Sequence, residues 1–428
     1  MKKTRKRKNH LLHIVMIFLT TFIGVMIIGV AAILIYRIMP GEAGSGDALE
    51  GGMVEKVSHL FAEAIPEEEP EEVLPDEEVL EEEVPAGRYA EVLSDTDYMK
   101  ANNIYPKETS VDNEVTLTFA GDILFDPGYS VMARLLQRQN GIYDSISLDL
   151  LEEMKNADIM MLNNEFPYSN RGTPTEGKQF TFRAKPESVN ILEDMGVDIV
   201  SLANNHAYDY GETALLDTLD VLEEAGMPYV GAGHNLEEAA RPVYFIAGDQ
   251  KIAFVSATQI ERLDNPDTKG ATDTTPGVFR CWNPGKLLEI VKEAKENSDF
   301  VVVYIHWGTE NTDQLDWAQL DQAPKLVDAG ADLIIGDHPH CLQPIQYVKG
   351  VPVIYSLGNF WFNSKQVDTC LVKAVIGDGG LESLQFIPAL QKDCTTYMLY
   401  GEEKERVLAY MRSISPGVMI DEDGYISK

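Results

Sequence analysis

The sequence predicts an α/β fold, in which helices cover a β-sheet, for the part of the chain that follows residue 112. From residue 115 onward, short apolar runs typical of buried strands alternate with stretches of helical periodicity. Several of these strands end in carboxylate, amide or imidazole side chains, and the carboxyl edge of an α/β sheet is where ligands bind. The clearest example is the sequence SLANNH at residues 201–206, which follows the apolar run at 197–200.

The N-terminal residues predict a membrane anchor. Basic residues fill most of positions 2–8, and a nearly unbroken apolar run extends from residue 11 to residue 36. This run exceeds the roughly 20 residues that span a bilayer and the roughly 7–15 of a cleaved signal peptide. We therefore expect a basic cytoplasmic tail at 1–10 and a single-pass signal anchor at 11–37, which place the rest of the chain outside the cell membrane.

Residues 38–112 are expected to form a disordered acidic linker. Every charged residue between Glu63 and Glu83 is acidic, and repulsion between like charges, together with proline, opposes regular structure. A spacer role is the simpler interpretation, and mimicry of an acidic polymer is the alternative. The net charge of -34 argues against nucleic acid as a partner, since phosphate binding needs basic patches.

The folded domain is predicted to span 113–400, followed by a C-terminal helix and tail at 401–428. The predicted strands are 115–120, 158–162, 198–202, 300–305, 332–335 and 351–356, with a hairpin of 244–246 and 251–257. The predicted helices are 131–139, 186–195, 213–225, 287–296, 317–329 and 402–413. After residue 368 the pattern weakens into β-like runs at 369–376 and 382–387. None of the four cysteines forms a C-x-x-C pair, so we expect them to be free and buried.

Potential metal ligands follow five of the predicted strands. They are Asp122, Glu165, Asn205, His306 and the pair His338 and His340. Carboxylate oxygen, amide oxygen and imidazole nitrogen are the ligand types of Zn, Mn or Fe. Each residue alone also has a structural explanation, such as an asparagine in a turn or a hydrogen-bonded core histidine. Their coincidence at strand ends favours a site for one or two divalent metal ions.

These motifs, in this order, resemble the CapA family of poly-γ-glutamate capsule synthesis proteins. The matching sequences are GD at 121–122, NE at 164–165, KxFxFR at 178–183, ANNH at 203–206, HWGxE at 306–310, GDHPH at 336–340 and SLGNF at 356–360. The resemblance covers roughly residues 114–362. It implies a four-layer αββα sandwich similar to calcineurin-like metallophosphoesterases, with a two-metal site.

The resemblance also implies roles for individual residues. Glu165 would bridge two metal ions, of which Asp122 and His340 complete one, and Asn205, His306 and His338 the other. His206 would be the general acid, and Asp209 is placed to orient its imidazole. Lys178, Arg183 and Asn204 are the candidates for contact with substrate. Metallophosphoesterases carry Asp-x-His on the first strand, whereas this chain has Leu124, so a site with a single metal ion is the alternative.

The resemblance implies a membrane-anchored extracytoplasmic protein of poly-γ-glutamate synthesis or export, working with membrane-embedded synthase components. One alternative is an extracellular metal-dependent hydrolase that acts on a phosphoester or another cell-envelope bond. Another is a catalytically inactive scaffold of the same fold. The acidic composition creates a field that is unfavourable for a polyanionic ligand, so whether the chain is an enzyme stays open at this point.

Overall fold

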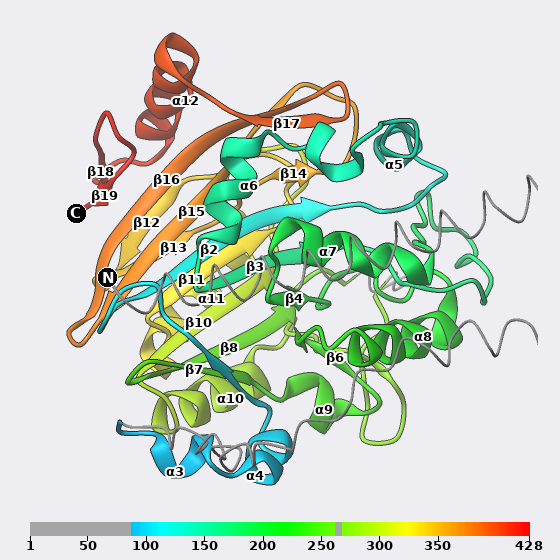
Figure 1. Cartoon of the computed structure of the whole chain (residues 1–428), viewed down its shortest axis with the longest axis horizontal. Helices are drawn as coiled ribbons and strands as arrows, with labels where there is room; N and C mark the ends of the chain where they lie inside the picture. The colour runs from blue at the N-terminus through cyan, green and yellow to red at the C-terminus, as the bar shows by residue number, and fades with distance from the viewer. Residues whose placement is uncertain (1–86, 262–267) are drawn as a thin grey trace, which may run out of the picture. The chain divides into compact units, whose positions relative to one another are not determined.

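Two β-sheets form the centre of the protein in the computed structural model, which describes residues 87–261 and 268–428 (Figure 1). The seven-stranded sheet has the order β1 (Ile104–Lys107), β7 (Val243–Ala247), β8 (Gln250–Thr258), β10 (Phe300–His306), β11 (Leu333–Asp337), β13 (Val351–Ile354) and β12 (Ile345–Val348). The eight-stranded sheet has the order β17 (Thr395–Met398), β16 (Gly380–Lys392), β15 (Val367–Gly377), β2 (Val115–Ile123), β3 (Ile159–Asn164), β4 (Ile199–Ser201) and β5 (Tyr229–Val230), with β14 (Asn359–Trp361) beside β2. Two short pairs are β6 (Ala232–Gly233) with β9 (Gly277–Val278), and β18 (Met419–Ile420) with β19 (Ile426–Ser427). In each large sheet a parallel group is extended by antiparallel strands, so the fold is mixed α/β.

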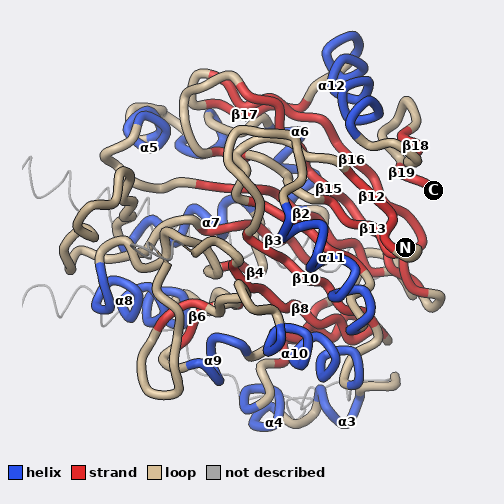
Figure 2. Tube along the Cα trace, turned by 180° about the vertical axis from the view of Figure 1, so that it is seen from behind, coloured by secondary structure: helices blue, strands red, loops and turns tan. Residues whose placement is uncertain are grey.

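Helices cover the outer face of each sheet. On the eight-stranded sheet they are η1 (Gly141–Asp144), η2 (Pro186–Val189), α5 (Ser130–Leu135), α6 (Leu148–Lys155), α7 (Asn190–Met195) and α8 (Gly211–Glu224). On the seven-stranded sheet they are α3 (Ala90–Leu93), α4 (Thr96–Ala101), α9 (Leu236–Ala240), α10 (Gly285–Glu296) and α11 (Trp317–Ala329). Figure 1 shows α6 and α7 in front of the strands, and Figure 2 shows α11 on the opposite side. The layers therefore follow the order helix, sheet, sheet, helix.

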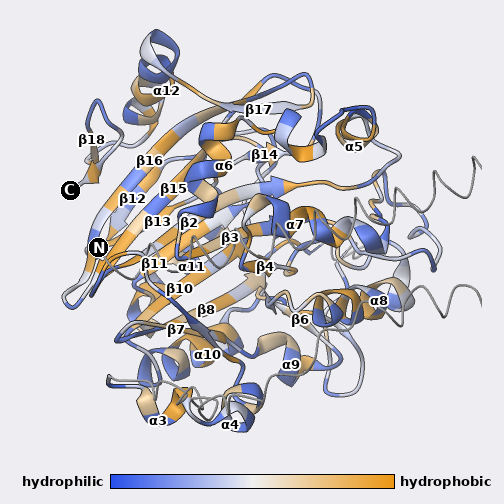
Figure 3. Ribbon diagram, viewed as in Figure 1, coloured by the Kyte–Doolittle hydropathy of each residue, from blue (hydrophilic) through white to orange (hydrophobic). Residues whose placement is uncertain are grey.

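The alternation of side chains along the strands produces these layers. Leu117 and Phe119 of β2 belong to the apolar cluster between the two sheets, together with Val302 of β10. Val301 and Val303 point the other way, into the cluster beneath α10 and α11. This is the two-residue period of a strand that is covered on both faces. Figure 3 shows the resulting apolar colour along the strands.

Most of the predicted elements are confirmed, with shifted ends. The predicted helix 317–329 is α11 itself, because Asp316 and Gln319 form a capping box at its start and Gly330, at φ 116°, ends it. The predicted hairpin is β7 and β8, which pair antiparallel. The two weak β-like runs become β15 and β16, a long antiparallel pair that lies between the edge strand β17 and β2 in the eight-stranded sheet.

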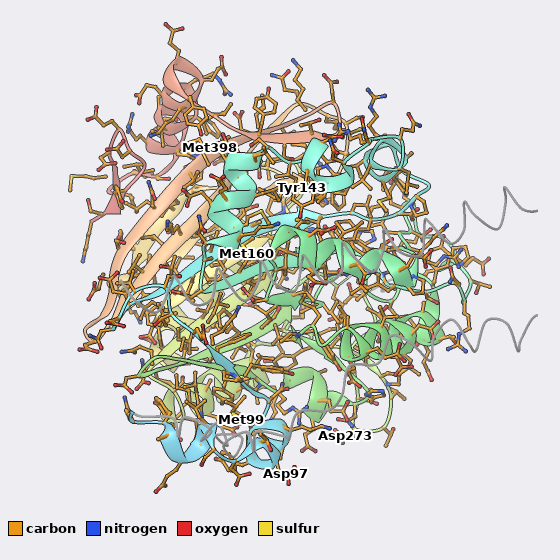
Figure 4. The ribbon with its side chains drawn as sticks, viewed as in Figure 1. Asp97, Met99, Tyr143, Met160, Asp273 and Met398 are labelled. Atoms are coloured by element: carbon orange, nitrogen blue, oxygen red, sulfur yellow. The ribbon has the colours of Figure 1, made fainter. Side chains whose placement is uncertain are left out.

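Two predicted boundaries are wrong. The linker was expected to reach residue 112, but α3, α4 and β1 precede that residue, and β1 pairs parallel with β7. Met99 of α4 is buried in the outer cluster of the seven-stranded sheet (Figure 4). The C-terminal segment is not a separate unit, because α12 (Gly401–Ile414) places Val407 in the cluster between the sheets.

The predicted membrane anchor at 11–37 and the acidic run lie outside the described residues. Within 87–261 and 268–428, no helix combines the length and the apolar character that a membrane span requires.

Candidate metal centre

The strands that carry the predicted ligands end at one edge of the two sheets. In the eight-stranded sheet β2, β3 and β4 are parallel neighbours, and in the seven-stranded sheet β10 and β11 are parallel neighbours. The hydroxyl of Tyr304 on β10 donates to the carbonyl oxygen of Ala120 on β2 over 2.8 Å and so connects the sheets close to this edge. The side chains that follow these strands therefore converge.

Two glycines allow the backbone segments next to the ligands to pack closely against the neighbouring backbone. A Cβ atom on Gly121 would lie 1.9 Å from the carbonyl oxygen of Gly358, and the amide of Asp122 donates to that oxygen over 3.1 Å. A Cβ atom on Gly336 would lie 2.2 Å from the carbonyl oxygen of Tyr355. Each glycine directly precedes an aspartate of the site, so the GD pairs in the sequence have a steric reason.

One group of possible ligand atoms, each with a lone pair, surrounds Nε2 of the fully buried His306. Its Nε2 lies 2.8 Å from Asn205 Oδ1, 3.1 Å from His338 Nδ1 and 3.8 Å from Glu165 Oε1. Its Nδ1 lies 2.9 Å from Asp337 Oδ1, so the ring proton is assigned to Nδ1 and Nε2 is left with a lone pair. An imidazole lone pair facing an amide oxygen at 2.8 Å is repulsive unless a cation lies between them.

A second group surrounds Asp122, which is also fully buried. His340 Nδ1 lies 3.0 Å from Asp122 Oδ2 and 2.9 Å from Asn359 Oδ1. Asn163 Nδ2 donates to Asp122 Oδ1 over 2.8 Å, which fixes the carboxylate. Ligand atoms of Glu165, His338 and His340 all lie within 4.8 Å of one another, as do those of Asp122, His306 and Asp337.

Glu165 is the strongest indication that the cluster accepts a cation. Its side chain is fully buried, and neither carboxyl oxygen has a hydrogen-bond partner among the described residues. Burial and then the charge of Asp122 raise the pKa of Glu165 well above its usual value. A buried carboxyl group without partners is costly, and a divalent cation would supply the missing positive charge.

Two imidazoles of this cluster, those of His306 and His338, are suited to the same purpose. Burial lowers the pKa of His306 and of His338 well below the usual value, and neighbouring histidines lower both further. Both rings therefore stay neutral and keep lone pairs for coordination. At His340, burial opposes the charge but Glu165 and Asp122 outweigh it and raise the pKa to about 9. The donor set of carboxylates, amides and imidazoles fits a divalent transition metal.

Replacing Glu165 with glutamine is expected to stabilise the metal-free protein at alkaline pH. Because the folded chain raises this pKa above 4.5, it holds a proton that the unfolded chain releases, so its stability falls as pH rises above that value. Glutamine cannot ionise, so we expect the substitution to raise the free energy of unfolding at pH 8, and to raise it more there than at pH 5.

Urea unfolding in the presence of a chelator at pH 5 and pH 8 measures this gain. Glu289→Gln is the control, since the Glu289 side chain is 70% exposed. A gain that is equal at both pH values, or equal in the control, would contradict the explanation.

His206 lies beside the cluster and is held from two sides. Its Nδ1 is 2.7 Å from Asp209 Oδ2, and its Nε2 is 3.9 Å from Glu165 Oε1. The ring of Phe182 packs against the imidazole with centroids 4.2 Å apart. Burial lowers the pKa of His206, and the charge of Asp209 opposes that effect. The geometry therefore leaves Nε2 as the nitrogen that faces the cluster.

The three residues expected to contact substrate have partners within the protein. Asn204 Nδ2 donates to Asn163 Oδ1 over 3.0 Å, and the amide of His206 donates to Asn204 Oδ1. Lys178 forms an ion pair with Asp209. The guanidinium of Arg183 lies 4.2 Å above the ring of Tyr210, and its Nη1 donates to the carbonyl oxygen of Arg171. Substrate contact by any of the three stays a prediction.

Three residues of the cluster were not predicted. Asp337 lies within the GDHPH motif, and its position directly before His338 was the signal that could have found it. Asn163 precedes the predicted NE pair by one position. Asn359 reaches His340 only because β14 pairs with β2, where Asn359 lies opposite Asp122.

Leu124 is buried in the outer apolar cluster, so this position supplies no ligand.

Comparisons with known proteins agree with the sequence motifs. A family model described as "Bacterial capsule synthesis protein PGA_cap" matches residues 116–364. "PGA biosynthesis protein CapA" of Bacillus subtilis (strain 168) is 32% identical over 292 residues, which cover 66% of this chain and 73% of that protein. "Capsule biosynthesis protein CapA" of Bacillus anthracis is 30% identical over 309 residues, covering 69% and 72%.

A more distant relative and a solved structure complete the comparison. "Probable polyglutamine synthesis accessory protein" of Mycobacterium tuberculosis is 28% identical over 208 residues, covering 47% of this chain and 55% of that protein. The crystal structure of 5'-nucleotidase from Candida albicans aligns with a TM-score of 0.34 and 11% identity, covering 64% of this chain and 54% of that one. A TM-score of this size does not establish a shared fold.

Proposed function

Since this chain belongs to the PGA_cap family of bacterial capsule synthesis proteins, we propose that it is a metal-dependent component of poly-γ-glutamate synthesis or export. The proposal includes the sequence-based expectation of a single membrane anchor that holds the folded part outside the cell. Partners would be membrane-embedded components of the same synthesis machinery. The observation that carries the metal requirement is Glu165, whose buried carboxyl group lies between four imidazoles and two aspartates and has no hydrogen-bond partner within 87–261 and 268–428.

The two groups of lone pairs suggest how the ligands divide. His306 Nε2, His338 Nδ1 and Asn205 Oδ1 would hold one divalent ion, as the family resemblance implies. Asp122, His340 and Asn359 would hold a second, with Asn359 as the residue that compensates for the absence of an imidazole at position 124. Glu165 would contact both. Asp337 would stay outside the ligand set and fix the ring of His306 through Nδ1, the usual arrangement around a metal-bound histidine.

The activity that this arrangement supports best is hydrolysis of a bond in the capsule polymer or another envelope component. When bound, a divalent ion polarises the bond to be broken and lowers the pKa of a water molecule. His206 would act as an imidazolium whose Nδ1–H donates to Asp209, would give the leaving atom its proton from Nε2 as the bond breaks, and would regain a proton at Nε2 from the water that attacks. The fold would then be used as in metallophosphoesterases, with a γ-glutamyl amide or a phosphoester as substrate.

The metal requirement is tested by elemental analysis of the full-length chain after incubation with Mn or Zn. We expect one or two ions per chain in the wild type and a marked loss in Asp122→Ala, at least as large as the roughly 10- to 100-fold loss of affinity seen when outer partners of a metal site are removed. Asp321→Ala is the matched control, because Asp321 lies on the surface, where it pairs with Lys325.

Metal bound to the wild type and the control, but not to Asp122→Ala, would support the proposal. The wild type should then shorten poly-γ-glutamate or cleave a phosphoester, and the substrate that is cleaved decides between the two. Equal metal in Asp122→Ala and the wild type would refute the ligand set. A wild type that binds no metal would leave the inactive scaffold as the function of this chain.

A further inference from the structure

The segment 172–183 crosses the site without regular secondary structure, and we refer to it as the site strap. It is fastened to the turn at 204–210 at several points. The amide of Thr175 donates to the carbonyl oxygen of Asp209 over 2.8 Å, and a Cβ atom on Gly172 would lie 2.1 Å from the carbonyl oxygen of Tyr210. Near its end, the amide of Phe182 donates to Asp209 Oδ2 over 2.7 Å.

Lys178 connects the strap to two residues of the turn. Its Nζ lies 2.5 Å from Asp209 Oδ1 and also donates to the carbonyl oxygen of Asn205, the residue whose amide oxygen faces His306. The side chain of Lys178 is only 6% exposed, and that of Asp209 is fully buried. An ammonium group held this way is poorly placed to grip a large anion from solvent.

The two oxygens of Asp209 have separate partners. Oδ1 accepts a hydrogen bond from Lys178 Nζ, and Oδ2 accepts hydrogen bonds from His206 Nδ1 and from the Phe182 amide. With Lys178 in place the carboxylate cannot turn, so the imidazole is fixed with Nε2 toward Glu165. Without it, Oδ1 would lose its partner and the carboxylate would be free to turn away from the imidazole.

From this chain of contacts we infer that Lys178 is a positioning residue, which fixes His206 through Asp209 and does not bind the substrate. The inference deepens the function proposed above and rests on it for the role of His206. The contacts between Lys178, Asp209 and His206 do not depend on that role, so the two can fail separately.

A double-mutant cycle of Lys178→Met, Asp209→Asn and the two combined tests the inference. In the full-length chain labelled with ¹⁵N-histidine, the proton on His206 Nδ1 should give a downfield NMR resonance, because it forms a hydrogen bond with the carboxylate of Asp209. Asp209→Asn should abolish that resonance, and Lys178→Met should weaken or shift it. In the Asp209→Asn background, where the resonance is already lost, Lys178→Met should not change the ring ¹⁵N shifts of His206 further, since the lysine acts through the aspartate. Lys178→Arg, which keeps the charge, should restore at least part of the wild-type signal.

The outcomes separate the possible roles of Lys178. If Lys178→Met leaves the resonance unchanged and raises KM about tenfold at constant kcat, the lysine binds substrate and the inference is wrong. Lys178→Met is at risk of unfolding because it leaves Asp209 Oδ1 buried without a partner. If it unfolds while the double variant folds, the lysine still acts through Asp209. If the double variant also unfolds, the inference fails, because the fold then needs Lys178 independently. Absence of any hydrolysis would count against the proposed function and leave the NMR result valid.

Discussion

His338→Ala is expected to release the ion held by His306, His338 and Asn205 and, with it, to abolish any hydrolysis. His338 Nδ1 lies 3.1 Å from His306 Nε2, and with alanine at this position one of the two imidazole donors of that group is gone. His338 is 5% exposed, and alanine supplies no donor atom in place of its Nδ1. We expect that ion to bind more than tenfold more weakly, so that metal content falls by up to one ion per chain.

The measurement is elemental analysis of the wild type and the variant after gel filtration, combined with urea unfolding in chelator to verify the fold. His234→Ala is the matched control, because His234 pairs with Glu238 on the surface and its side chain is 46% exposed. If His338→Ala retained as much metal as the control, its assignment as a ligand would be wrong, and the lone pairs around His306 would need another explanation.

His206→Ala should have the opposite profile, with full metal content and almost no turnover. The nearest oxygen of Glu165 is 3.9 Å from His206 Nε2, and the other ring nitrogen is occupied by Asp209, so the imidazole is not needed to hold an ion. Loss of a general acid costs roughly 10²- to 10⁴-fold in rate. The loss should be smaller for a substrate with a good leaving group, because that group departs without a proton.

Steady-state kinetics on two substrates that differ only in the leaving group measure this difference, and elemental analysis measures the metal in the same preparation. A variant that loses metal together with activity would place His206 among the ligands. A variant that keeps full activity on both substrates would remove it from the reaction.

The sequence predicts the elements and ligands that depend on local patterns. The strands of the parallel groups were predicted because each is buried on both faces, and α11 because its cap and its terminal glycine are adjacent in the chain. His306, His338 and Asp122 were predicted because they follow such strands directly. In each case the signal lies within a few residues of the feature it predicts.

What could not be predicted depends on contacts between distant parts of the chain. Asn359 reaches the cluster through the pairing of β14 with β2, which joins residues more than 200 positions apart. The partner of Lys178 is set by an irregular segment, and no periodicity indicates which way such a segment folds. The elements between residues 90 and 107 were missed because β1 is short, contains Pro106 and is stabilised by its pairing with β7.

The two histidines of the GDHPH motif are held on backbone that favours glycine. His338 has φ 92° and His340 has φ 56°, and an L-residue in this region costs of order 1–3 kcal/mol. Exchange of either histidine for glycine would relieve the backbone and remove a ligand in the same step. In a descendant that no longer used the metal, such an exchange would increase stability without penalty, so mutation would move these positions toward glycine. Under the proposed ligand set, histidine at both positions supplies an imidazole donor at the expense of backbone stability.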